Sequence, residues 1–381
     1  MISRDDIWAA RAALAAFAVI GIGWGGFAAL VPVIKIQSDA GDAAFGLALL
    51  VAGIGTLAAM WLAPRAEGRL DHRAMVVFSI AMAVSFLSPG LVTGVVGLAL
   101  AMLVVSGISV TLDVIMNARL SAIEAARRRP LMNFAHGVFS IAYAIAALLA
   151  GLGREAGGSP LMILTALGGL SLALCFVVAQ DAPRQIALDD DGPSSRQTWL
   201  IWLAGSVMLL GFMAEQATEG WSALRLERDL GGGAVQGAFG PAILGLTMAI
   251  GRLGGQAMIH GRSELSVMAI AATMAAIGAA AAAWATGLAL AYLGFALLGV
   301  GVSVIVPMAY SYTGKRVRDA ARSQAIANVS VIGFAGFFIG PLAMGALAEN
   351  YGLSASFTFI AVAIALIPLV FVPALFARER S

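Results

Sequence analysis

The sequence predicts an all-α membrane protein with twelve transmembrane helices in two pseudo-symmetric halves of six. Three observations favour this class: a strongly apolar composition, twelve bilayer-length apolar runs, and self-similarity at a shift of 194 residues. Of the 381 residues, 60% are hydrophobic and only 12% are charged, whereas soluble domains have about 25% charged residues. Mean hydropathy is +0.92. This composition leaves too little polar surface to keep a globular protein in water.

The apolar runs have the length of membrane-spanning helices. A helix needs about 20 apolar residues to cross a hydrocarbon core of roughly 30 Å. The runs are also twice as long as a barrel strand and do not alternate, which favours helices. The first run is too long for a signal peptide, so we expect it to be retained. The predicted spans are 12–34, 44–64, 74–91, 95–117, 131–152, 160–179, 200–223, 237–259, 265–285, 288–311, 324–347 and 354–376.

Basic residues predict the orientation. Nineteen of the 23 lysines and arginines, Arg252 included, are assigned to the side that holds both termini. Because positive loops stay inside, both termini are predicted to be cytoplasmic. The polar interval 180–198 contains "DDDGPSS", which is typical of a linker. It would separate an N-terminal half, residues 1–179, from a C-terminal half, residues 199–381.

Composition also excludes several classes of partner and site. A net charge of +2 is too small to imply nucleic acid. Cys175 is the single cysteine, so neither an intramolecular disulfide nor a cysteine-rich metal site can form. We expect no metal and no cofactor. The expected partners are the lipid bilayer, a small solute and protons, and the expected state is a monomer.

The 194-residue shift aligns the two halves without a gap. Ala44-Phe45-Gly46 falls on Ala238-Phe239-Gly240, and Gly107, Ser109 and Val110 fall on Gly301, Ser303 and Val304. The common register predicts a duplicated six-helix unit. Two parallel six-helix halves resemble the plan of the major facilitator superfamily. More narrowly, "GISVTLDVIMNARLSAIE", "RPLMNFAHGVFSIAYAIAALLAG" and "AEQATEGWSALRL" resemble bacterial inner-membrane transporters of the YbjJ type, related to fucose permeases.

Two motifs of that superfamily are altered here. The loop between spans two and three usually has the pattern Gly-x-x-x-Asp-Arg-x-Gly-Arg-Arg, but this chain has "APRAEGRLDHR", with the aspartate and glycine positions scrambled. Drug/proton antiporters resemble one another in a Gly-Pro motif on span five. Here span five has no proline, and Gly340-Pro341 lies on span eleven instead. The first departure argues against the interdomain latch that this loop motif normally supplies, and the second disfavours multidrug efflux.

Two glutamates inside the seventh span form the first candidate site. Glu215 and Glu219 are four residues apart and so share one helix face. The repeat aligns 215–220 with "GIGWGG" at 21–26, and paired irregular segments are the best sequence indicator of a transporter's binding site. A carboxylate at the bilayer centre normally faces a cavity or a partner. We expect Glu215 to bind solute or a proton, with Trp24 and Gln216 lining the pocket. Glu219 is expected to be a second, peripheral group of this solute or proton site; the alternative is that it pairs with Arg225 or reaches interfacial water. Trp221 is expected to anchor at the membrane interface.

A second candidate site lies nearer the cytoplasm, on spans four and five. Asp113 lies six residues before Arg119, and His136 lies six residues after Pro130. An aspartate beside a histidine can exchange a proton near physiological pH. The alternative is a static polar clasp between the two helices. Asn117 and Asn133 flank this pair. Asn328 and Tyr310 are expected to line the cavity from the opposite half.

The predicted function is secondary active transport of a small polar solute, either sugar-like or an organic metabolite, by alternating access and with proton coupling. The alternative is a proton-driven efflux pump for amphipathic or cationic compounds. An intramembrane enzyme using His136 and Ser140 is disfavoured because no nucleophile motif, phosphate-binding loop or metal-ligand cluster is present. A receptor is disfavoured because the chain has no soluble sensory domain.

Overall fold

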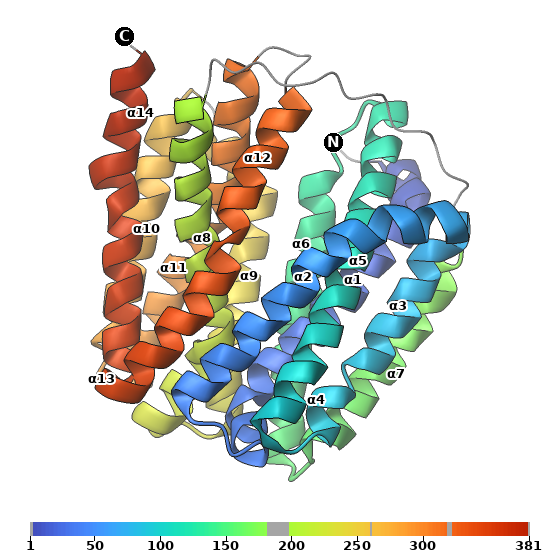
Figure 1. The fold of residues 1–381 in the computed structure, drawn as a ribbon, viewed down its shortest axis with the longest axis vertical. Helices are drawn as coiled ribbons and strands as arrows, with labels where there is room; N and C mark the ends of the chain where they lie inside the picture. The colour runs from blue at the N-terminus through green and yellow to red at the C-terminus, as the bar shows by residue number, and fades with distance from the viewer. Residues whose placement is uncertain (1–2, 181–197, 260, 318–321, 380–381) are drawn as a thin grey trace.

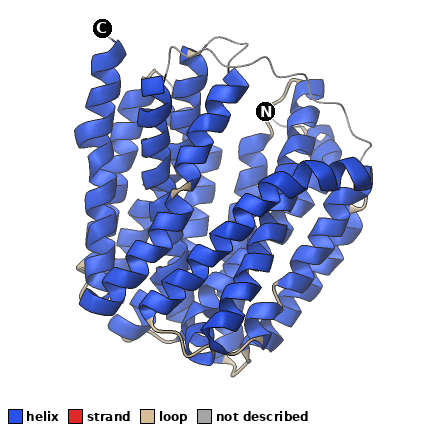
Figure 2. Ribbon diagram, viewed as in Figure 1, coloured by secondary structure: helices blue, strands red, loops and turns tan. Residues whose placement is uncertain are grey.

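The computed structural model describes residues 3–180, 198–259, 261–317 and 322–379, and within these ranges all regular structure is helical (Figure 2). Most of the predicted 180–198 linker lies outside the described residues. We call α1 to α7 the N half and the remaining helices the C half (Figure 1). The N half contains α1 (Arg4–Gln37), α2 (Asp42–Leu70), η1 (Asp71–Arg73), α3 (Ala74–Ser85), α4 (Ser88–Leu91), α5 (Gly94–Arg127), α6 (Met132–Glu155) and α7 (Pro160–Val178).

The C half begins after the linker and contains two short π-helical turns. Its elements are α8 (Thr198–Leu224), η3 (Arg225–Asp229), α9 (Ala234–Ile259), α10 (Glu264–Ala283), α11 (Leu288–Arg316), α12 (Arg322–Phe334), α13 (Gly336–Leu366), η5 (Ile367–Phe371) and α14 (Val372–Glu379).

Eleven helical segments of the described chain are long and apolar enough to cross a membrane. The last of them, Ala325–Glu379, contains the final two predicted spans, because the chain reverses at Gly352. That residue has φ +80°, a left-handed conformation that glycine adopts without steric cost. Figure 1 shows α12 descending to this turn and α14 returning to the opposite end. The prediction of an all-α membrane protein is confirmed.

The helices extend past the predicted apolar runs at one end of the molecule. The α5 helix continues ten residues beyond the predicted limit, to Arg127, and α2 continues to Leu70. Polar residues can continue a helix into water because its backbone hydrogen bonds are internal. The third span is instead divided into α3 and α4. The length of an apolar run thus predicts the membrane-spanning portion of each helix but not the residues at which the helix begins and ends.

The glycines of "GIGWGG" do not loosen α1, which is continuous from Arg4 to Gln37. They let α1 approach α6 closely. A Cβ on Gly25 would lie 2.1 Å from the carbonyl oxygen of Tyr143, and one on Gly21 would lie 2.4 Å from that of Phe139. Small residues four apart permit such backbone contact between membrane helices. The predicted irregularity at 215–220 is also absent, since α8 is regular there.

The two halves meet mainly through α6 against α9 and α2 against α13. We call the end that carries both termini the terminal end, and the opposite end, with the turns at 38–41, 156–159, 230–233 and 352, the distal end. Figure 1 shows the ribbons of the two halves together at the distal end and spread apart toward the terminal end. The helices converge where Gly46 of α2 faces the backbone of Pro341 and Gly345.

Candidate functional site

An arginine within the membrane-spanning part of α9 joins the two halves. Arg252 of α9 donates a hydrogen bond of 2.6 Å to the hydroxyl of Ser140 on α6. Its other terminal nitrogen lies 3.4 Å from the Glu215 carboxylate on α8. Both charged side chains are largely buried. Arg252 therefore connects an N-half hydroxyl to a C-half carboxylate, and we call this contact the Arg252 bridge.

The prediction that Arg252 is one of the cytoplasmic charges that fix the topology is wrong, because its side chain is largely buried and contacts Glu215 and Ser140. Its position in the sequence could have identified Arg252 as a site residue, because it lies seven residues before the end of the predicted span 237–259. A charged residue inside a span normally faces a partner. The sequence thus indicates that Arg252 needs a partner, but only the packing of α8 against α9 shows that this partner is Glu215.

One face of α6 supplies three polar side chains to this site. His136, Ser140 and Tyr143 follow the helical spacing i, i+4, i+7. The His136 ring lies edge-on to Phe17 of α1 at 4.9 Å between ring centroids. The Tyr143 hydroxyl is fully buried and has no hydrogen-bond partner among the described residues. Ser140 and Tyr143 were not assigned to the site from sequence, because a serine and a tyrosine on an apolar helix have no distinguishing pattern.

Glu219 lies one turn from Glu215 on α8 and is only partly exposed. No described residue donates a hydrogen bond to it; Glu215 and Arg252 are the charged groups that act on it electrostatically. The expected pairing with Arg225 is wrong. Arg225 donates to Asp229 at 2.9 Å and to the backbone carbonyls of Ala282, Ala283 and Ala285. Glu219 is left without a cation of its own.

Asp113 and His136 are not in direct contact in this structure. Asp113 accepts a hydrogen bond of 2.9 Å from Asn117 on its own helix, and no described hydrogen bond or ion pair connects it to His136. The reason is packing: α5 and α6 have only a small mutual contact, and α1 packs extensively on α6. His136 therefore faces Phe17 and the electrostatic field of Arg252. Neither the predicted proton-sharing pair nor the clasp is formed.

The remaining predicted residues occupy separate positions. Trp24 donates its indole N–H to Ser109 of α5 at 2.9 Å and lies edge-on to Phe86. Tyr310 of α11 shares a hydrogen bond of 2.8 Å with Ser330 and is within electrostatic reach of Asp113 in the other half. Gln216 and Asn328 are partly exposed, and Asn133 is exposed near the start of α6.

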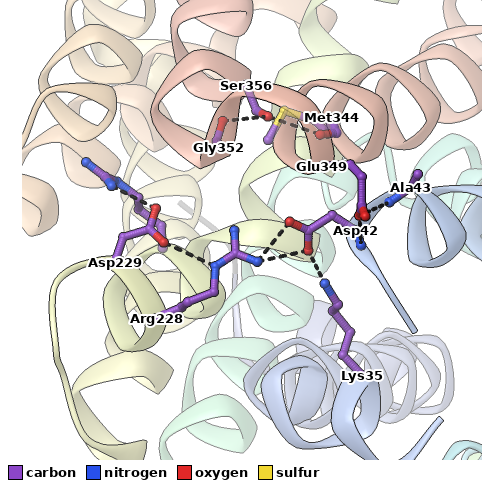
Figure 3. A network of polar contacts seen from close by, with 10 residues as sticks. Lys35, Asp42, Ala43, Arg228, Asp229, Met344, Glu349, Gly352 and Ser356 are labelled. Carbon is purple, nitrogen blue, oxygen red and sulfur yellow. Dashed lines mark hydrogen bonds and ion pairs between the residues drawn. The ribbon is translucent and has the colours of Figure 1, made fainter. Parts of the chain in front are cut away.

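At the distal end, charged groups connect the halves directly. Asp42, the first residue of α2, binds Lys35 of its own half and also accepts hydrogen bonds of 2.8 and 3.0 Å from Arg228 of the C half. Glu349 accepts from the backbone amides of Asp42 and Ala43, at 2.7 and 3.2 Å (Figure 3). A carboxylate at a helix N-terminus satisfies amides that have no helical partner.

A second distal contact is a bidentate ion pair between the halves. Arg154 at the end of α6 donates to both carboxylate oxygens of Glu227, at 2.6 and 2.7 Å. Beside these contacts Trp221 is fully buried, edge-on to Phe45 of α2 at 5.3 Å. The expectation that Trp221 anchors at the membrane interface is wrong, because the closed distal end covers it. We call the contacts of Asp42, Glu349, Arg154 and Glu227 across the halves the distal latch.

At the terminal end, the described ion pairs stay within one half. Arg127 binds Asp6, and Arg119 approaches Glu67, all in the N half. Lys315 binds Glu264 and Arg316 binds Glu379, all in the C half. Among ion pairs with both partners described, those between the halves thus occur only at the distal end.

Comparison with known proteins agrees with this architecture. The family model of the Major Facilitator Superfamily matches residues 13–317 and 257–381. The chain belongs to the major facilitator superfamily. An uncharacterised transporter of this superfamily from Yersinia pestis is 29% identical over 91% of this chain and 90% of its own length. The membrane protein MosC of Rhizobium meliloti is 25% identical over 90% of this chain and 84% of its own length.

Solved superfamily structures share the fold at low sequence identity. The nucleoside transporter NupG superimposes with a TM-score of 0.72 at 16% identity, covering 100% of this chain and 100% of its own. A bacterial homologue of the human lysosomal transporter Spinster, in an inward-facing and unoccupied conformation, gives 0.71 at 15% identity over 99% and 98%. These likenesses concern the fold alone.

Proposed function

We propose that this member of the superfamily is a secondary active transporter that moves a small polar solute across the bacterial inner membrane by alternating access, coupled to protons. The two units that rock are the halves defined above, residues 1–179 and 199–381. With the termini in the cytoplasm, the distal latch joins the halves on the outer side of the membrane. The observation that supports this most directly is the Arg252 bridge, a buried charged contact between the halves at mid-helix.

Proton binding to the Arg252 bridge would change the contact between the two halves. Arg252 is held by Ser140 of the N half and Glu215 of the C half. A proton bound by Glu215 removes the negative charge that attracts Arg252 and so weakens the ion pair. Arg252 could then change partners as the halves move. Proton binding at one carboxylate would thus alter a contact that spans both halves.

Replacement of Glu215 by glutamine tests this mechanism. Glu215→Gln keeps the size and hydrogen bonding of the side chain but removes its titration. We expect loss of gradient-driven accumulation in proteoliposomes, with solute exchange in the absence of a gradient retained, since exchange requires no proton movement. The protein should still insert and fold, although Arg252 loses its counter-ion. The matched control is Glu155→Gln, at an exposed position, which should transport normally. Wild-type accumulation by Glu215→Gln would refute this role for Glu215.

A further inference from the structure

Three polar groups beside the Arg252 bridge have no hydrogen-bond partner among the residues described. They are the Glu219 carboxylate, the Gln216 amide and the Tyr143 hydroxyl. Glu219 and Gln216 are partly exposed, whereas Tyr143 is only 2% exposed, so bulk water does not reach its hydroxyl. Buried polar groups are nearly always paired, and each exception requires an explanation. A ligand that bonds to the Tyr143 hydroxyl is such an explanation.

Two of these groups, the Tyr143 hydroxyl and the Glu219 carboxylate, lie at one level of the molecule and come from different halves. On α6, Tyr143 follows Ser140 by three residues, and on α8, Glu219 follows Glu215 by four. Both helices run toward the distal end, and the Arg252 bridge joins Ser140 to Glu215. Tyr143 and Glu219 are therefore both about one turn, roughly 5 Å, nearer the distal end than the bridge. Both glutamates act electrostatically on the Tyr143 hydroxyl.

The site lacks one positive charge. Its charged groups are Glu215 and Glu219 from α8 and Arg252 from α9, while α6 contributes His136 and the neutral Tyr143 hydroxyl. The ion pair of Arg252 is with Glu215, so the second carboxylate has no counter-ion. Glu219 is only partly exposed, and a carboxylate there is unfavourable unless it binds a proton or a cation. Such a site selects a ligand that supplies the missing charge.

We propose that Glu219, Gln216 and Tyr143 form a subsite for one positively charged nitrogen of the solute, which makes the solute class an organic amine. Glu219 neutralises the ammonium group, and the Gln216 carbonyl and Tyr143 hydroxyl accept its hydrogen bonds; an ammonium group has up to three donors. This inference rests on the proposed transport function but not on its proton coupling. A solute on this subsite would contact α6 of one half and α8 of the other.

Binding can be measured on the purified full chain by thermal unfolding against compounds that differ only in charge. The probes are glucosamine, glucose and glucuronate, together with phenethylamine, phenethyl alcohol and phenylacetate. We expect the amines to stabilise the protein most. Glu219→Gln should weaken amine binding about tenfold or more, since it removes a charge-assisted contact. Tyr143→Phe should weaken it severalfold, and Glu155→Gln should bind as the wild type does. Equal binding of amine, alcohol and acid would mean that a proton alone occupies the subsite, and would overturn the proposal.

A second measurement needs no ligand. Gln216→Lys places an ammonium group three residues before Glu219, within reach on the same helix face. We expect it to raise the unfolding temperature when Glu219 is present and to lower it in the Glu219→Gln background. A lowered unfolding temperature in both backgrounds would count against the subsite. Amine binding without pH dependence of transport would instead refute proton coupling and leave the subsite intact.

Discussion

The two ends of the molecule use charge differently. At the distal end, Arg154 with Glu227 and Arg228 with Asp42 connect the N half to the C half. At the terminal end, described pairs such as Lys315 with Glu264 connect helices of the same half. Charge contacts at the distal end therefore hold the halves together, and those at the terminal end hold each half intact. An alternating-access cycle would have to break the first kind and leave the second unchanged.

Preventing the distal end from opening should have the largest effect. Ala43→Cys and Glu349→Cys, in a chain with Cys175 replaced by alanine, place thiols on the two halves where the Glu349 carboxylate now caps α2. A short bifunctional thiol reagent should abolish transport, and reduction should restore it. Each single variant, treated with the same reagent, is the control. Full transport after complete cross-linking would show that the distal end does not open.

The Arg154–Glu227 pair should be the strongest single contact of the latch. The two side chains are only 8% and 16% exposed, so removal of one partner leaves the other charge largely away from water. Glu227→Gln should cost about 3 kcal/mol of distal closure, which corresponds to a shift of roughly 100-fold in the open population.

Labelling of a buried cysteine measures that shift. A side chain at Gly220 would meet only Leu49 of the other half, at 3.6 Å, so Gly220→Cys fits the closed state and becomes reactive when the halves part. Its labelling rate should rise in Glu227→Gln. The increase should be smaller when Arg154→Gln is added, because neither charge is then left unpaired. An unchanged rate would mean that this pair does not hold the end closed.

Arg228→Gln should have a smaller effect at the same end. Asp42 keeps Lys35 after the change, and the Arg228 side chain is 42% exposed. The expected cost to distal closure is about 1 kcal/mol, typical of an exposed pair, and it would raise Gly220→Cys labelling roughly fivefold. A larger effect than that of Glu227→Gln would reverse the ranking of the two contacts.

Lys315→Gln at the terminal end should have the smallest effect. Its side chain is 67% exposed, and its partner Glu264 belongs to the same half. We expect labelling of Gly220→Cys to stay the same within about twofold and stability to change by no more than about 0.5 kcal/mol. A large change in labelling would show that charge pairs within a half also set the conformation, and the contrast between the two ends would then be wrong.

Local sequence was sufficient for the candidate carboxylates but not for their partners. Glu215 and Glu219 stand out because charges are rare and costly inside a membrane span. Arg252 lies 37 residues from Glu215 and meets it only because α9 packs beside α8. Asp113 and His136 show the opposite error: they are close in the sequence, yet α1 rather than α5 is the principal neighbour of α6 within the N half.

The sequence by itself determined the all-helical membrane architecture and the approximate positions of the spans. It could do so because the transfer of apolar residues into lipid depends on composition over about 20 residues, and because a backbone in lipid must satisfy its hydrogen bonds within one helix. Only the tertiary structure decided which buried charges are neighbours, that the glycines of α1 pack on α6, and that Trp221 lies inside the distal end. Those outcomes depend on contacts of a few ångströms between helices distant in the chain, and no periodicity within a single helix encodes them.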